Sequence, residues 1–98
     1  MTRNNDPILL VLASLAGGDK HGYAMIVDIQ QFAGITLGPG TLYGAITRLD
    51  QAGWIAPVKS DDRRQPYTLT LAGRQELQKE VGELDGVVRT AMNRLKSA

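Results

Sequence analysis

The stretch Gly38–Ile55, GPGTLYGAITRLDQAGWI, decides the fold that this sequence predicts. Gly38 can cap a helix and Pro39 can open it, because the first helical residue needs no partner for its N–H. Gly53 stands where a left-handed residue commonly ends a helix, and Trp54-Ile55 begins an extended segment. Between these ends, apolar residues follow the i, i+3, i+4, i+7 spacing of one helical face: Leu42, Ala45, Ile46 and Leu49.

The opposite face of this helix is small and polar, and it carries Thr41, Tyr43, Gly44, Thr47, Arg48 and Gln51. A short amphipathic helix with a sharp start and such a face suits insertion into the major groove of DNA. Many surface helices share this pattern, so the segments on both sides decide the interpretation.

The composition describes one domain with a small core. Of the 98 residues, 43% are hydrophobic and 21% are charged, and a subunit interface would add to the core that a chain of this size can build. The chain has no cysteine and one histidine, which leaves no thiolate or paired imidazole for a transition metal and no catalytic triad. We therefore expect no metal and no cofactor, and an enzyme is the least favoured class.

The sequence predicts no membrane segment. The apolar run Ile8–Leu15 is too short to span a bilayer, and only Arg3 precedes it, so the basic region of a secretory signal is missing. We expect a cytoplasmic protein. The formal net charge of +1 neither supports nor excludes nucleic-acid binding, because positive charge can gather on one face.

The first predicted helix starts at Asp6-Pro7 and ends at Ala16-Gly17-Gly18. Its residues Ile8–Leu15 are apolar nearly all round, which indicates burial on more than one side. In so small a protein this suggests that one side meets another subunit, through Leu9 and Leu12. A central core helix is the alternative.

The second predicted helix runs from Tyr23 to about Ala33, after a loop over Asp19–Gly22, and Gly34 closes it. Its apolar stripe comprises Met25, Ile26, Ile29, Phe32 and Ala33, while Asp28, Gln30 and Gln31 face outward. A short turn, Ile35-Thr36-Leu37, leads to the Gly38 start. Two amphipathic helices joined in this way form a helix-turn-helix.

A β-hairpin is predicted next, from two short runs, Ile55–Lys59 and Pro66–Leu69, on either side of a polar turn. Pro57 and Pro66 restrict both runs to edge strands. A hairpin that follows the recognition helix is a wing.

The wing tip carries Arg63 and Arg64, which can pair with DNA phosphates. The alternative is a solvated turn whose charge Asp61-Asp62 neutralises. Lys59 and Tyr67 belong to the same predicted surface.

Thr70 caps the last predicted helix, which runs from Leu71 to about Lys96. It is too long to belong only to the winged core, so we expect it to pair with its own copy in a two-fold dimer. Gly82 and Gly86 weaken it by ~1 kcal/mol each, and they either allow close approach of a partner or mark a bend. Its heptad-like seam comprises Leu77, Val81, Leu84, Val88, Ala91 and Leu95. The chain thus divides into a winged helix-turn-helix domain over residues 1–70 and a dimerisation helix over residues 71–98.

Several residues of the Gly38 helix are assigned to DNA contacts. Tyr43 offers its hydroxyl to a phosphate or its ring to a sugar, or else packs half-buried on the wing. Thr41 and Thr47 reach base edges or thymine methyl groups, or else are plain surface. Arg48 is assigned to a guanine or phosphate contact, and an intrahelical pair with Asp50 is a poor alternative because residues at i and i+2 do not face each other.

The remaining assignments lie outside that helix or at its start. Thr36 and Gly40 meet phosphate through backbone N–H groups. Tyr23 clamps the DNA backbone or packs in the core. His21 is a capping or structural residue, and Trp54 packs between the wing and the helices rather than against a ligand.

Together these segments resemble the PadR family of transcriptional regulators, and the resemblance spreads from about Pro7 to Ala98. The His-Gly-Tyr piece and the Gly-Thr-Leu-Tyr piece, in that order, are its most specific part. The matching segments are His21-Gly22-Tyr23, Leu37–Ile46, Arg48-Leu49, Gly53–Ile55, Arg63–Tyr67 and Leu69–Arg74. The chain departs from the family pattern in having Gly38 where members often have serine, and in the wing-tip pair Asp61-Asp62.

The resemblance implies a mainly α fold with a small β-wing, in which the last and first helices make a homodimer. It implies a transcriptional repressor that binds double-stranded DNA. It also implies that some members respond to a small aromatic or drug-like ligand near the dimer interface. We expect the dimer to read a short inverted repeat whose half-sites are about 34 Å apart. The alternative is a winged-helix module that binds a protein and no DNA.

Overall fold

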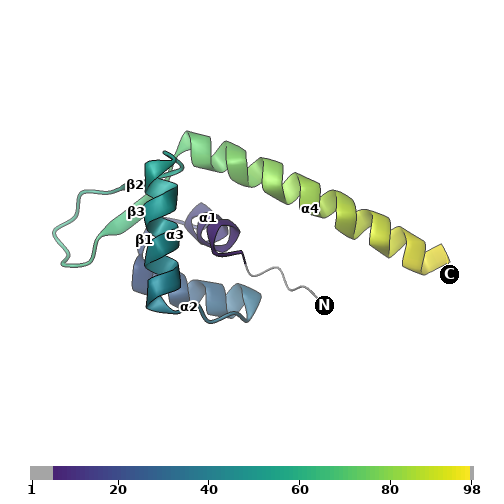
Figure 1. The fold of residues 1–98 in the computed structure, drawn as a ribbon, viewed down its shortest axis with the longest axis horizontal. Coiled ribbons are helices and arrows are strands. Elements are labelled where there is room, and N and C mark those ends of the chain that lie inside the picture. Colours follow the sequence, from purple (N-terminus) through teal and green to yellow (C-terminus); the bar gives the residue numbers. More distant parts are fainter. Residues whose placement is uncertain (1–5, 98) are drawn as a thin grey trace.

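The computed structural model describes residues 6–97. Its elements are α1 (Pro7–Ala16), β1 (Lys20–His21), α2 (Gly22–Ala33), α3 (Pro39–Gln51), β2 (Ile55–Pro57), β3 (Pro66–Leu69) and α4 (Leu71–Ser97). In Figure 1 the first three helices and the strands form a core, and α4 extends from one edge of it. The predicted winged helix-turn-helix with a long last helix is confirmed.

The helix ends follow the local signals. The Asp6 carboxylate accepts a hydrogen bond from the N–H of Ile8 at 3.0 Å, which caps α1. Gly38 is extended and caps α3 without a side chain, and Pro39 is the first helical residue, as predicted. Gly34 and Gly53 take the left-handed conformation, with φ of 68° and 79°, that favours glycine after a helix.

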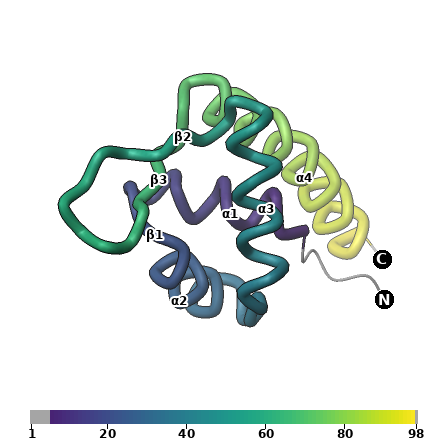
Figure 2. The backbone as a smooth tube through the Cα atoms, turned by 60° about the vertical axis from the view of Figure 1, so that its left-hand side comes forward, coloured from purple at the N-terminus to yellow at the C-terminus, as the bar shows by residue number. Residues whose placement is uncertain are grey.

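The core lies around α1, which contacts α2, α3, α4 and β3. Figure 2 shows α1 running through the middle of the molecule, with α2 below it and α3 across it. The buried residues of this helix therefore belong to the core of the protomer, and a subunit contact is left only to its half-buried residues. Leu12 is 1% exposed and packs inside the protomer, which corrects its assignment to a subunit contact, whereas Leu9 is only half-buried.

The three strands form an antiparallel sheet in the order β1-β3-β2. Two predictions are corrected here. The segment Lys20-His21 is a strand and not a loop, because it pairs with Tyr67 and Pro66. The strand β3 is central and not an edge strand. Pro66 is tolerated there because it is the first residue of its strand, and its carbonyl still accepts a hydrogen bond from Val58.

The helix α2 differs from its predicted faces at two residues. Phe32, expected to point inward, is exposed. Asp28, expected to face outward, accepts a hydrogen bond of 2.7 Å from the buried hydroxyl of Ser14 and forms an ion pair of 3.8 Å with Lys20. A buried hydroxyl requires a partner, and α2 supplies it.

The helix α4 begins as predicted at Thr70, whose Oγ1 accepts a hydrogen bond from the N–H of Gly73 at 3.0 Å. Gly73 is buried, and the position requires glycine because a Cβ atom there would lie 1.9 Å from the carbonyl oxygen of Trp54. Leu77 packs against the core one turn later. The predicted division of the chain at residue 70 stays a prediction.

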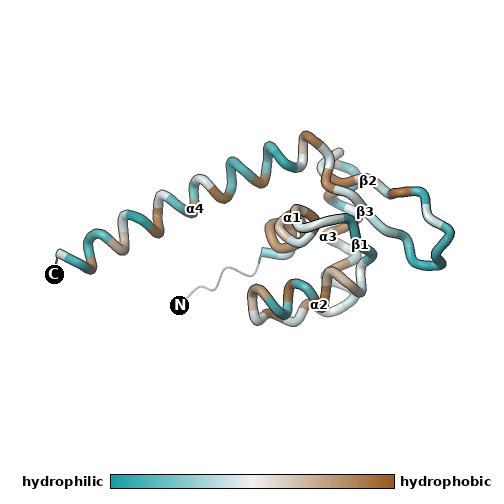
Figure 3. The backbone as a smooth tube through the Cα atoms, turned by 180° about the vertical axis from the view of Figure 1, so that it is seen from behind, coloured by the Kyte–Doolittle hydropathy of each residue, from teal (hydrophilic) through white to brown (hydrophobic). Residues whose placement is uncertain are grey.

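Residues 81–97, the distal α4, are exposed throughout. Figure 3 shows that apolar residues nevertheless recur along this segment. Its large exposed apolar side chains are Val81, Leu84, Val87, Val88, Met92 and Leu95. Within residues 6–97, no helix has the length and apolar character that crossing a bilayer requires.

Candidate nucleic-acid interface

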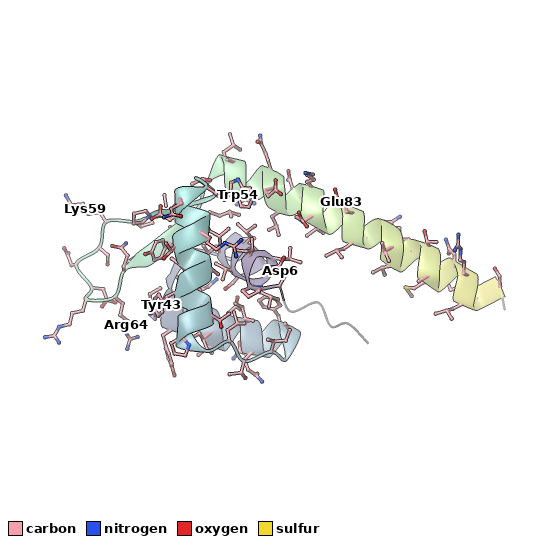
Figure 4. All side chains as sticks on the ribbon, in the orientation of Figure 1. Asp6, Tyr43, Trp54, Lys59, Arg64 and Glu83 are labelled. Carbon is pink, nitrogen blue, oxygen red and sulfur yellow. The ribbon has the colours of Figure 1, made fainter. Side chains whose placement is uncertain are left out.

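The start of α2, the outer side of α3 and the wing converge on one surface pocket, here called the wing pocket. Figure 4 shows Tyr43 on α3 and Arg64 on the wing at this side of the molecule. The pocket is lined by His21, Gly22, Tyr23, Tyr43, Arg63, Arg64, Gln65 and Tyr67. This lining contains two arginines and no carboxylate. It therefore suits an anion.

Tyr43 lies against the start of α2 and is still 52% exposed. A Cβ atom on Gly22 would lie 2.8 Å from the Tyr43 hydroxyl oxygen, so only glycine at that position leaves room for the ring. Tyr43 thus packs on the start of α2 and still offers an exposed surface to a ligand. The sequence offered packing on the wing or contact with DNA, and it did not anticipate this contact with Gly22.

Arg64 lies over the ring of Tyr23, with its Cζ atom 5.7 Å from the ring centroid. This distance is within the range of a cation–π interaction. Tyr23 is 61% exposed, so the alternative that placed it in the core is wrong. Its ring supports the guanidinium group at the edge of the wing pocket.

The acidic residues of the wing tip shape the turn. The Asp62 carboxylate accepts a hydrogen bond from the backbone N–H of Arg64 at 3.2 Å, and the hydroxyl of Ser60 accepts one from Asp62 at 3.1 Å. Within residues 6–97 the ion pairs are Lys20–Asp28 and Arg89–Asp85. Neither wing arginine is therefore paired with a carboxylate in the part of the chain that the structure describes.

The outer side of α3 has a low profile. Gly40 is exposed, and a Cβ atom at Gly40 or Gly44 would meet open space. Thr47 donates its hydroxyl to the carbonyl of Tyr43 at 2.9 Å, and Thr36 is exposed in the turn before α3. The backbone of α3 can thus approach a flat or grooved partner closely.

Arg48 does not share the side of α3 that carries Tyr43. At 3.6 residues per turn the two side chains are about 140° apart around the helix axis. Arg48 lines a hollow with Asp6 and Ile8 at the start of α1, and Thr41 lines the same hollow. The structure therefore separates Arg48 and Thr41 from the wing pocket. Their predicted DNA contacts stay predictions on a different flank of α3.

Two further predicted residues lie on the wing itself. Lys59 is exposed beyond the end of β2, and Figure 4 places it on the arm of the wing away from Arg64. Tyr67 on β3 packs against the core and lines the wing pocket. The wing pocket thus unites Tyr67 with Tyr23, Tyr43 and both arginines, and it excludes Lys59.

The sequence interpretation missed His21 and Gln65 as members of the wing pocket. His21 was correctly predicted as a cap, since its Nδ1 accepts a hydrogen bond from Ala24 at 3.3 Å. Its place in the wing pocket depends on the pairing of β1 with β3, and a strand of two residues gives no periodic signal in the sequence. The Gln65 amide donates to the carbonyls of Val58 and Pro66, at 2.8 and 2.6 Å, and braces the two arms of the wing.

Comparisons with known proteins identify relatives of this chain. Over 78 residues the chain is 46% identical to a 37.1 kDa protein in transposon TN4556 of Streptomyces fradiae, covering 80% of this chain and 23% of that protein. The chain therefore spans about a quarter of the length of this curated relative.

Solved structures share the fold. A PadR family transcription regulator from Clostridium difficile is 23% identical, with a TM-score of 0.78 over 91% of this chain and 96% of the other. Bacillus subtilis PadR in complex with operator DNA is also 23% identical, with a TM-score of 0.63 over 76% of this chain and 45% of the other. Residues 11–79 match the family model described as the transcriptional regulator PadR-like family. Because that match spans more than half of the chain, this protein belongs to the PadR-like family of transcriptional regulators.

Proposed function

We propose that this protein is a regulator that binds double-stranded DNA, with α3 in the major groove and the wing pocket on the phosphate backbone. The wing pocket carries this proposal, because it combines exposed tyrosines with two arginines that form no ion pair within residues 6–97, and its lining contains no acidic residue. Arginine and tyrosine side chains are frequent donors to DNA phosphates. The low profile of α3 beside Gly40 and Gly44 supports its entry into the groove.

The comparison with a solved complex also supports DNA binding. Bacillus subtilis PadR, whose fold is shared, forms a complex with operator DNA. Each predicted contact residue on α3 is exposed in this chain, including Thr41, Thr47 and Arg48. In the proposed complex, the α3 residues meet the bases and the wing residues fix the position of the protein on the backbone.

We further propose that the DNA-binding form is a homodimer in which distal α4 pairs with its copy. Four of the exposed apolar residues of distal α4, Val81, Leu84, Val88 and Leu95, belong to the seam that the heptad spacing predicts, and Val87 and Met92 are exposed beside it. Leu9 is half-buried on α1 and can border the contact. Such a dimer presents two α3 helices to an inverted repeat with half-sites about 34 Å apart. Repression, and release by a small aromatic ligand, stay predictions.

The test is a fluorescence anisotropy titration of the protein with the DNA upstream of its own gene, at several salt concentrations. We expect log affinity to fall linearly with log salt concentration, because arginine contacts release counterions from the phosphates. An affinity that is independent of salt would contradict the proposal. Protein capture without any DNA binding would favour the interaction-module alternative.

The double variant Arg63→Ala with Arg64→Ala should weaken binding to all DNA sequences alike and lower the salt slope by roughly 1 to 2. The control is Arg94→Ala with Lys96→Ala, which removes the same charge from the exposed end of α4. This control should leave the slope unchanged. Equal slopes for the wing variant and the wild-type protein would remove the wing pocket from the interface.

A further inference from the structure

His21 lies between two hydrogen-bond donors. Its Nδ1 atom is 3.3 Å from the backbone nitrogen of Ala24, and its Nε2 atom is 3.4 Å from Nη1 of Arg64. An amide N–H and a guanidinium N–H can only donate. A neutral imidazole has one nitrogen that accepts and one that donates, so it can satisfy only one of the two neighbours.

The fixed neighbour decides which nitrogen accepts. The N–H of Ala24 is held in the first turn of α2 and has no carbonyl within its own helix to bond. Arg64 is on the exposed wing and can turn its side chain. Nδ1 therefore accepts the capping bond, and the hydrogen is on Nε2. Two donors, Nε2–H of His21 and the guanidinium of Arg64, then point at the same space in the wing pocket.

Within residues 6–97 no acceptor is hydrogen-bonded to Nε2 of His21, the wing pocket contains no carboxylate, and Asp62 is engaged by the backbone of the turn. We propose that His21 is a phosphate-binding residue, whose Nε2–H and the Arg64 guanidinium together hold one oxygen of the DNA backbone. The exposed side chains of Tyr23 and Tyr43 line the same pocket. The inference rests on the proposed DNA-binding function and adds to it a neutral donor that the sequence interpretation treated only as a cap.

The tautomer can be observed directly, because His21 is the only histidine in the chain. A long-range ¹H–¹⁵N spectrum of the imidazole should show hydrogen on Nε2 in the free protein. Adding duplex DNA should shift the Nε2 resonance and leave the Nδ1 resonance nearly in place. Hydrogen on Nδ1 in the free protein would overturn the inference.

Two variants separate the cap from the phosphate contact. In His21→Asn the amide oxygen can still cap α2, but the side chain is too short to donate into the wing pocket. We expect unchanged thermal stability and about tenfold weaker DNA binding, the size of one hydrogen bond to a charged acceptor. In His21→Gln the longer amide places a donor near the position of Nε2 but no longer caps. We expect binding within about twofold of wild type and a Tm lowered by about 4 °C.

The salt dependence gives the sharpest distinction. His21→Asn should keep the wild-type salt slope, because a neutral donor releases no counterion, whereas Arg64→Gln should lower the slope by about 1. His21→Asn with wild-type affinity would overturn the inference, and so would a slope lowered by 1 in that variant. If the wild-type protein ignores DNA, the proposed function fails instead.

A free phosphate ion offers the same chemistry as the DNA backbone. Inorganic phosphate, replacing chloride at equal ionic strength, should shift the Nε2 resonance of the wild-type protein far less than DNA does, because a free ion gains none of the contacts that α3 makes with DNA. A phosphate-induced shift equal to the shift caused by DNA would assign the pocket to the free ion and overturn the assignment to the DNA backbone.

Discussion

The winged core and distal α4 use the same apolar residue types with opposite outcomes. In the core, side chains such as Met25 and Leu42 are fully buried within one protomer. In distal α4, Val81, Leu84 and Val88 are exposed although they follow an equally regular spacing. The difference teaches that periodic apolar residues specify a surface to be buried and leave open whether the same chain or a second copy covers it.

The energetic contrast is large. Fully burying one such side chain contributes roughly 1.5–3 kcal/mol, and distal α4 carries several that the protomer leaves in water. In proteins, most of the stability of a helix comes from tertiary packing of its apolar face rather than from intrinsic propensity. Burial of distal α4 against a partner is therefore strongly favourable. Removing apolar groups from the winged core should lower the free energy of unfolding, whereas removing them from distal α4 should weaken assembly.

The largest expected effect is in the core. Leu49→Ala should lower the free energy of unfolding by about 2–5 kcal/mol, because Leu49 is 1% exposed and its loss leaves a cavity. Urea unfolding at one fixed protein concentration measures the change. Leu71→Ala is the matched control at the first residue of α4, outside the predicted seam, where the side chain is 73% exposed, and the loss should be under ~1 kcal/mol. Equal losses in the two variants would erase the comparison.

Substitutions in distal α4 should change the oligomeric state of the protein. Leu84→Glu with Val88→Glu should produce monomers in sedimentation experiments and weaken DNA binding by about a hundredfold, or ~2.7 kcal/mol, since one α3 then acts alone. The control is Thr90→Glu with Asn93→Glu, which adds the same charge on the other side of α4. A Leu84 and Val88 variant that stays dimeric would locate the interface elsewhere.

The smallest effect compares two glycines of α4. A Cβ atom at Gly86 would meet open space, so Gly86→Ala should raise the free energy of unfolding by ~1 kcal/mol through helix propensity. The same change at Gly73 should destabilise the protein, because the new Cβ would lie 1.9 Å from the Trp54 carbonyl oxygen. Thermal unfolding of both variants checks the opposite signs. Loss of the dimer in Gly86→Ala would instead show that a partner approaches this glycine closely.

Much of the fold could be predicted because its signals are local. The side chains of Asp6 and Thr70 accept hydrogen bonds from N–H groups within three residues along the chain, and Gly38 starts α3 through its extended backbone alone. The wing pocket could be predicted only in part. Its tyrosines and arginines have recognisable chemistry, and the helical period alone separates Arg48 from Tyr43, but which of these two flanks faces the wing depends on how α3 packs against α1.

The sequence by itself determined the helix boundaries, the winged helix-turn-helix order and the family, since short-range spacing and capping residues carry that information. Only the tertiary structure decided that Leu12 lies in the core, that β3 is the central strand and that His21 faces Arg64. The physical reason is distance along the chain. His21 and Arg64 are 43 residues apart, and their contact exists because β1 and β3 pair.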